Sequence, residues 1–121
     1  MGLIDDLRLD IGDDEEFFEE ACTPQIWCAT IVTDKVYDKA RDDTIIFVNP
    51  TLGGPTIINL NSSSVIGQIC VIKDMKGDAN INPILIRPPS GGSIDGFAEI
   101  QITQRLQSFM FTCNGSNWSV I

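Results

Sequence analysis

Side chains that could carry out catalysis are few in this chain, and their spacing matches no catalytic motif. The sequence contains no histidine, so the commonest general base near neutral pH is missing and neither a Ser-His-Asp triad nor a Cys-His pair can form. The glycine pairs at 53–54 and 91–92 lack the Lys-Ser/Thr step of a phosphate-binding loop. Acid pairs such as Asp13–Asp14 and Asp42–Asp43 lie outside any predicted cleft, which favours solvated charge over glycoside chemistry. We therefore expect a protein that is not an enzyme and has no catalytic residues.

Metal and cofactor sites are not predicted either. None of the four cysteines belongs to a Cys-x-x-Cys pair, and there is no histidine to complete a mixed zinc site. Asp78 and Asn80 in the loop at 76–80 supply too few oxygen ligands for calcium. Cys70 and Cys113 lie in apolar runs and are expected to be small buried hydrophobes. A disulfide between Cys22 and Cys28 would need an oxidising compartment and is the less favoured alternative.

The net charge of −9 is concentrated in the first part of the chain. Residues 1–20 hold nine carboxylates and one cation, Arg8, which gives −8. The other 101 residues hold eight acids and seven bases, which gives −1. Because nucleic-acid binding requires a basic surface, this distribution argues against a nucleic-acid partner. We expect a nearly neutral body with an acidic N-terminal arm.

The acidic arm contains short apolar groups at helical spacing. Leu3, Leu7 and Ile11 fall along one helical face. Gly12 interrupts this pattern, and a second short helix would carry Phe17 and Phe18. Such short helices are marginal in water on their own. The arm therefore either packs on its own β domain or orders against a partner, and the second alternative makes these five apolar residues the docking anchors.

The length of the apolar runs and the charge of the first residues predict where in the cell the protein is made. No apolar run approaches the roughly 20 residues of a membrane helix. The first residues are acidic where a signal peptide would be basic. We expect no membrane partner, and synthesis in the cytoplasm of a cell.

The rest of the chain reads as a series of short strands. Phe109–Thr112 and Trp118–Ile121 flank the turn residues Asn114–Asn117, which predicts a closing β-hairpin. Further strands are predicted at 26–33, 44–48, 56–60, 68–74, 83–87 and 98–103, separated by Gly, Pro and polar turns. The charged stretch 34–43 is interpreted as a short helix or a solvated connector. The predicted fold is all-β, a small antiparallel β-sandwich or barrel (residues 43–121) that follows an acidic, partly helical arm and joint (residues 1–42).

Individual side chains in this domain have structural interpretations. Lys73 and Asp74 end a strand and are expected to be exposed charges. The runs at 45–48 and 69–72 are apolar on both faces, which a small monomer cannot easily cover, so they favour an oligomer. The aromatic residues expected to serve core or trimer packing are Phe47, Phe109, Phe111 and Trp118.

Six phrases of the body, in this order, resemble a β module found in structural proteins of tailed phages. They are Ile45–Pro50, Gly54–Leu60, Gly67–Asp74, Asn82–Ile86, Ser93–Gly96 and Asn114–Trp118. The resemblance covers about residues 43–121 and leaves the arm outside. It implies a β fold and a role in the virion, usually as a homotrimer, and it implies no active site.

Two functions follow from this resemblance as expectations. The first is a trimeric capsid decoration (cement) protein or head fibre, whose body forms the trimer and whose arm docks on the major capsid protein. The second is a tail fibre or appendage tip that recognises a host surface. A head–tail joint protein is a further alternative.

Overall fold

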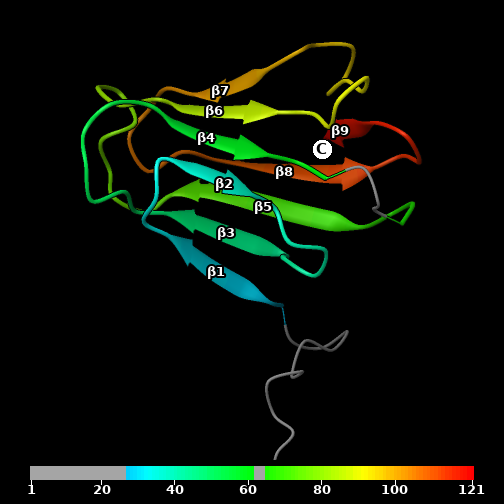
Figure 1. Cartoon of the computed structure of the whole chain (residues 1–121), viewed down its shortest axis with the longest axis horizontal. Helices are drawn as coiled ribbons and strands as arrows, with labels where there is room; N and C mark the ends of the chain where they lie inside the picture. The colour runs from blue at the N-terminus through cyan, green and yellow to red at the C-terminus, as the bar shows by residue number, and fades with distance from the viewer. Residues whose placement is uncertain (1–26, 62–64) are drawn as a thin grey trace, which may run out of the picture.

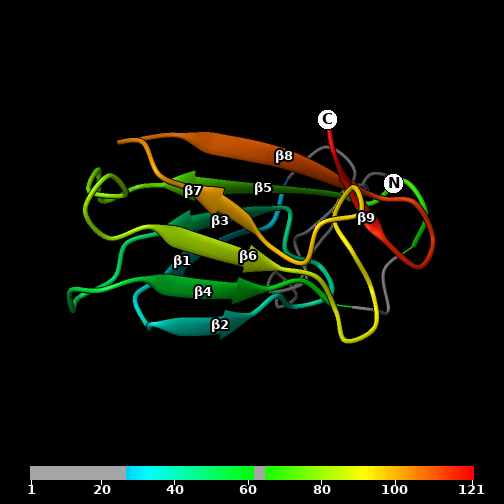
Figure 2. The same cartoon turned by 90° about the horizontal axis from the view of Figure 1, so that it is seen from above.

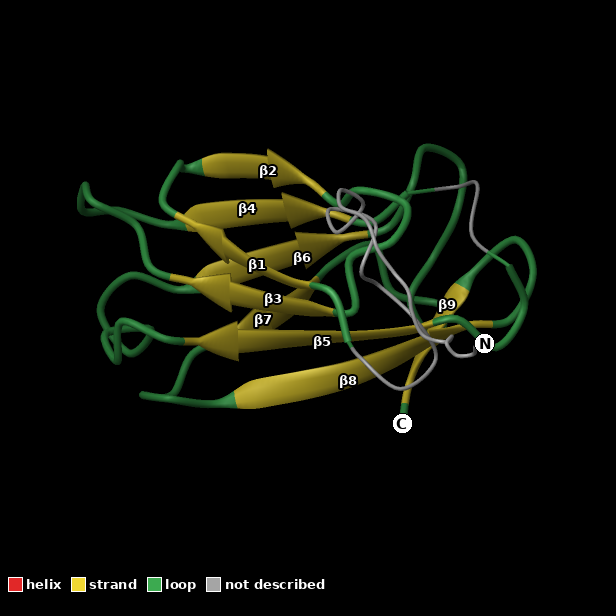
Figure 3. Cartoon of the chain, turned by 90° about the horizontal axis from the view of Figure 1, so that it is seen from below, coloured by secondary structure: helices red, strands yellow, loops and turns green. Residues whose placement is uncertain are grey.

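The computed structural model describes residues 27–61 and 65–121, which form an all-β fold with no helix in these ranges (Figure 3). This confirms the predicted fold class. The arm residues Leu3, Leu7, Ile11, Phe17 and Phe18 lie outside the described residues. The strands are β1 (Ala29–Val32), β2 (Val36–Asp38), β3 (Ile45–Val48), β4 (Thr56–Asn59), β5 (Ile69–Asp74), β6 (Ile84–Arg87), β7 (Ile100–Ile102), β8 (Ser108–Cys113) and β9 (Trp118–Val120).

These strands form two sheets rather than a closed barrel (Figures 1 and 2). The five-stranded sheet has the order β1-β3-β5-β8-β9, and the four-stranded sheet has the order β2-β4-β6-β7. Within them, β1, β3 and β5 are parallel, and so are β2, β4 and β6. Antiparallel pairing is confined to β5–β8, β8–β9 and β6–β7. The expected antiparallel sandwich is therefore wrong in its strand direction, and both sheets are mixed.

The parallel pairing follows from how the chain is connected. From β1 to β5, each strand is followed by a strand of the other sheet. A hairpin would return the chain beside the strand it has just left, in the opposite direction. Here the chain re-enters each sheet only after crossing the other sheet and back, so it arrives running in the same direction as before.

The charged stretch 34–43 contributes to the fold directly. It contains β2, which pairs in parallel with β4, so the expected short helix or solvated connector is wrong. Residues 29–38, which the sequence prediction placed in the arm and joint, supply an edge strand to each sheet. In addition, Lys39 and Asp43 are buried. Charge in this stretch thus serves the interior as well as the surface.

The core lies between the two sheets and consists mostly of inward-facing isoleucine and valine. Alternation along the strands is regular: in β3, Ile46 and Val48 are buried while their neighbours are half-exposed. The predicted closing hairpin is confirmed, since β8 and β9 pair in antiparallel fashion with Thr112 opposite Ser119. Gly115 in its turn has a φ of 120°, a conformation that side chains with a β-carbon rarely adopt.

Asp74 is buried, which corrects the expectation that it is an exposed charge. Its Oδ1 accepts a hydrogen bond from the backbone N–H of Gly77, and its Oδ2 accepts from the N–H groups of Ala79 and Leu106, each at 3.0 Å. The carboxylate thereby joins the loop after β5 to the loop before β8. Such charge-assisted bonds are stronger than neutral ones.

The cysteines divide into two kinds. Cys70 and Cys113 are free and buried, as predicted. Burial raises the pKa of the Cys70 thiol to about 12, so this side chain is an inert hydrophobe at neutral pH. Cys28 is disulfide-bonded, and the pairing considered for it, with Cys22, falls outside the described residues.

Candidate functional site

The outer face of the five-stranded sheet carries a row of apolar side chains. Ala29, Ile45, Val71 and Met110 lie in direct register across β1, β3, β5 and β8. On β3, β5 and β8 these residues alternate with inward-facing residues of the core. We call this surface the apolar face; its outward-pointing apolar members also include Ile31, Phe47 and Ile69.

The apolar face is nearly free of charge. Among the outward-pointing residues of its described strands, Lys73 is the single charged side chain, and its amino group donates to the Leu106 carbonyl at the end of the sheet. Ile31 is 56% exposed and Met110 is 38% exposed. Contiguous apolar surface of this kind, with a single charged side chain, marks a contact between proteins more often than a surface facing water.

The outer face of the four-stranded sheet is different, because polar side chains on it bond to one another. Asn59 Nδ2 donates to Asp38 Oδ1 at 2.8 Å. Arg87 Nε donates to Glu99 Oε1 at 3.0 Å, and Gln101 Nε2 donates to Glu99 Oε2 at 2.7 Å. These bonds from Gln101 and Arg87 lower the pKa of Glu99. Apolar side chains are present here too, since Val36, Ile57 and Leu85 lie in register across β2, β4 and β6. This face therefore differs from the other in its bonded charged and amide groups.

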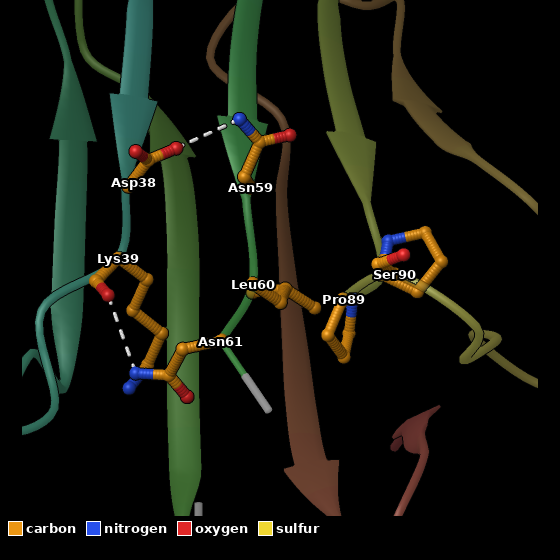
Figure 4. A pocket seen from close by; sticks show the side chains of 8 residues that line it. Asp38, Lys39, Asn59, Leu60, Asn61, Pro89 and Ser90 are labelled. Atoms are coloured by element: carbon orange, nitrogen blue, oxygen red, sulfur yellow. Dashed lines mark hydrogen bonds between the residues drawn. The ribbon is translucent and has the colours of Figure 1, made fainter. Parts of the chain in front are cut away.

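An open hollow of about 380 Å³ lies beside the ends of β2, β4 and β6 (Figure 4). Lys39 is a buried member of its lining, and its Nζ donates to the carbonyls of Ala40 at 3.0 Å and Arg41 at 3.3 Å. The ammonium also lies 5.6 Å from the centroid of the Trp118 ring. Burial lowers the pKa of Lys39. Because the partners of the Lys39 ammonium are backbone carbonyls and an aromatic ring, we interpret its role as structural.

Eight residues line the hollow. The residues are Asp38, Lys39, Asn59, Leu60, Asn61, Pro88, Pro89 and Ser90. In Figure 4, Asp38 and Asn59 bond to each other across neighbouring strands. Within residues 27–61 and 65–121, no group of three His, Cys, Asp or Glu side chains could hold a metal ion. We assign the hollow no chemistry.

A buried hydrogen-bond network around Asp43 joins the two sheets at their open edges. Asp43 Oδ1 accepts from Thr30 Oγ1 of β1 at 2.6 Å. Its Oδ2 accepts from the Tyr37 hydroxyl of β2 and, at 2.8 Å, from the N–H of Ala40. Sequence reasoning missed this network, because Asp43 stands next to Asp42 in a charged stretch and gives no local signal of burial.

The Tyr37 hydroxyl is expected to ionise above its usual pKa of 10.0 in the folded protein, because burial and the Asp43 carboxylate both raise that pKa. The folded state then holds the proton more tightly than the unfolded state. This contribution to the free energy of unfolding is therefore complete below about pH 10 and falls as pH rises through the folded pKa. Since Tyr37 is the chain's single tyrosine, phenolate absorbance reports it directly.

The matched variant for this titration is Asp43→Asn. It removes the negative charge and should lower the Tyr37 pKa, while burial, the largest cause of the shift, keeps it above 10.0. The guanidinium-unfolded protein supplies the reference midpoint. Equal midpoints for folded and unfolded protein would contradict the network as described.

The aromatic residues predicted for core or trimer packing occupy three environments. Phe111 and Trp118 are core residues, and Trp118 Nε1 donates to the Asn61 carbonyl at 3.1 Å. Phe109 is partly buried, packs against the core and lies 6.1 Å from Phe111 between ring centroids. Phe47 points outward on the apolar face. The structure thus places Phe47 apart from the other three.

Two further observations bear on function. No helix in the part of the chain that the structure describes could span a bilayer. In the comparisons with protein-family models and with curated proteins, nothing matches this chain.

Proposed function

We propose that this chain is a structural protein of a tailed-phage virion, a homotrimeric decoration (cement) protein that binds the head shell and stabilises it. The observation that carries the proposal is the apolar face, which offers a surface with one charged side chain, Lys73, for contact between copies. The six sequence phrases that resemble phage β modules all lie in the body that bears this face. In this proposal the protein is made in the host cytoplasm and resides in the virion.

The acidic arm is the proposed attachment to the shell. Its apolar residues Leu3, Leu7, Ile11, Phe17 and Phe18 would contact the major capsid protein or another virion protein. A segment that becomes ordered on docking loses affinity to the entropy of ordering. Three arms on one trimer would compensate, because the second and third contacts form at high effective concentration.

A host-binding module at the tip of a tail fibre or appendage is the second candidate. Phe97 favours it, because this aromatic ring is 61% exposed on the loop 93–97. Ser93 N–H bonds to Asn117 Oδ1 at 2.9 Å, so this loop lies against the polar turn of the closing hairpin. Aromatic and amide side chains that lie together on neighbouring loops are suited to binding an exterior surface.

Co-sedimentation with undecorated heads of the phage that encodes the chain tests the first candidate. The full chain should pellet with the heads in multiples of three per site, and a chain lacking residues 1–20 should remain in the supernatant. Protein without heads, and heads without protein, are the controls. If neither chain pellets, the decoration proposal fails, and binding to host-cell surfaces becomes the measurement to make.

A further inference from the structure

Four connections between strands meet at one end of the molecule. They are residues 33–35 (β1–β2), 49–55 (β3–β4), 75–83 (β5–β6) and 103–107 (β7–β8) (Figures 1 and 3, left). We call this surface, together with Lys73 at the end of β5, the loop end. The β1 strand begins at the opposite end of the molecule and runs toward the loop end.

Hydrogen bonds between its connections hold the loop end in one arrangement. Asn82 Oδ1 accepts from the N–H of Gly54 at 2.7 Å, which joins two of the loops. Asp74 joins a third by accepting from the N–H of Leu106. Leu106 has a φ of 61°, a strained conformation for leucine that this bond helps to maintain. A surface that is already ordered loses little entropy when it binds a partner.

The loop end also concentrates positive charge. Four of the seven cations outside residues 1–20 lie there, and each donates to a backbone carbonyl: Lys35 to Gly54, Lys73 to Leu106, Lys76 to Pro50 and Arg105 to Gly77. Carbonyl acceptors hold these groups in place without neutralising them. Among the pairs that the described residues form at this end, only Lys76–Asp78 brings a carboxylate near a cation, at 4.0 Å.

The net charges of the two ends of the molecule have opposite signs. At the loop end, four cations face Asp34, Asp74 and Asp78, which gives +1. At the opposite end, Lys39, Arg41 and Arg87 face five acids, which gives −2; the acids are Asp38, Asp42, Asp43, Asp95 and Glu99. The two sums give the −1 of the body, so the molecule is electrostatically dipolar.

Large apolar side chains are exposed between these cations. Leu52 is 67% exposed, Ile81 74%, Leu106 52% and Met75 44%. The combination of fixed cations and exposed apolar groups fits a segment that alternates acidic and apolar residues. Electrostatic complementarity of this kind fixes both the partner and its register.

We propose that, in the free protein, the loop end binds residues 1–14 of its own chain. That segment carries five carboxylates and Arg8, which gives −4, and alternates them with Leu3, Leu7 and Ile11. The distance permits it, because the strands between the two ends span about 20 Å and residues 15–20 span about as much when extended, without any contribution from residues 21–28, where the disulfide of Cys28 lies. A linked segment has an effective concentration near the millimolar range, which favours the same chain over a second copy. This inference concerns the protein before it meets any shell and does not depend on the proposed function.

Amide NMR spectra of the full chain test the proposal. The variant is Asp5→Asn, Asp6→Asn, Asp10→Asn and Asp13→Asn combined, which removes four charges and keeps the apolar residues. We expect shifts of the Gly54, Gly77 and Leu106 amides and none at Gly91 and Gly96 of the opposite end. Adding about 1 M NaCl, where the Debye length is about 3 Å, should produce the same shifts in the native chain. Shifts confined to residues next to Trp27, or equal at both ends, would overturn the proposal.

Two further variants and a mixture complete the design. Arg105→Gln should reproduce the loop-end shifts in part, whereas Arg41→Gln, which removes one exposed cation at the opposite end, should not. The labelled asparagine variant, mixed with unlabelled native protein, should give an unchanged spectrum. Loop-end shifts on mixing would mean that a neighbouring copy supplies the segment, and would overturn the assignment to the same chain.

Discussion

Replacing Asp74 by asparagine is expected to lower the free energy of unfolding by about 3 kcal/mol, a large part of the total stability of a domain of this size. The carboxylate accepts three backbone N–H groups in a buried position. Asparagine has the same shape but only one acceptor oxygen, and its amide N–H₂ would face an N–H of the backbone. At least one buried donor therefore loses its partner. Urea unfolding of both proteins measures the difference.

The control for this experiment is Asp34→Asn. Asp34 is exposed, so the same change of charge there should alter the free energy of unfolding by less than about 0.5 kcal/mol. Hydrogen exchange adds a local readout, since the amides of Gly77 and Leu106 should lose protection in the Asp74 variant. Equal stability of the two variants would show that Asp74 does not organise the loops.

Met110→Lys is expected to weaken association between copies by at least about 100-fold, or about 2.7 kcal/mol. Met110 ends the row Ala29–Ile45–Val71–Met110 on the apolar face. In the proposed trimer, each copy would bring a lysine into the middle of an apolar contact, where an unpaired charge is costly to desolvate. The residue is 38% exposed in the single chain, so the substitution leaves the core between the sheets intact.

Gln101→Lys is the matched control. Gln101 points outward from the other sheet, opposite Leu85, and its replacement adds the same charge to a face that already carries Arg87 and Glu99. Sedimentation equilibrium of the native chain and both variants gives the association constants. If Met110→Lys associates as tightly as the native chain, or if both variants weaken equally, the apolar face is not the contact between copies.

Local sequence signals predicted most of the strands but not their partners. The closing hairpin could be predicted because Asn114, Gly115 and Asn117 favour a tight turn between two β-prone runs. In β3 and β5, by contrast, the runs at 45–48 and 69–72 are apolar at every position, so the sequence does not show which side chains face inward. The sequence also contains no information about which strand lies alongside, and for β1, β3 and β5 that neighbour is reached only after a strand of the other sheet. Strand direction therefore required the structure.

Buried charges were the other feature that could not be predicted. Acids near strand ends are usually exposed, so nothing in the sequence distinguished Asp74 from Lys73 beside it. Asp74 can be buried because backbone N–H groups distant in sequence, including that of Leu106, donate to its carboxylate. Likewise, β2 was hidden among Asp34, Lys35 and Asp38, where three residues are too few for a periodic signal. For the candidate site, the apolar runs at 45–48 and 69–72 predicted that one outer face of the sheet contacts another copy. The structure adds that Val71 and Met110 lie in register on that face.

The alternation of strands between the two sheets has a consequence for the rate of folding. Ala29 pairs with Ile45, Ile45 with Val71, and Ile57 with Leu85. Each parallel pair thus closes a long loop before it gains any stabilisation, and topologies dominated by such non-local pairs fold in milliseconds to seconds. The hairpin of β8 and β9 is local and can form in about 1–10 μs. We expect it to form first and to present Phe111 and Trp118 as the surface on which the slower parallel strands assemble.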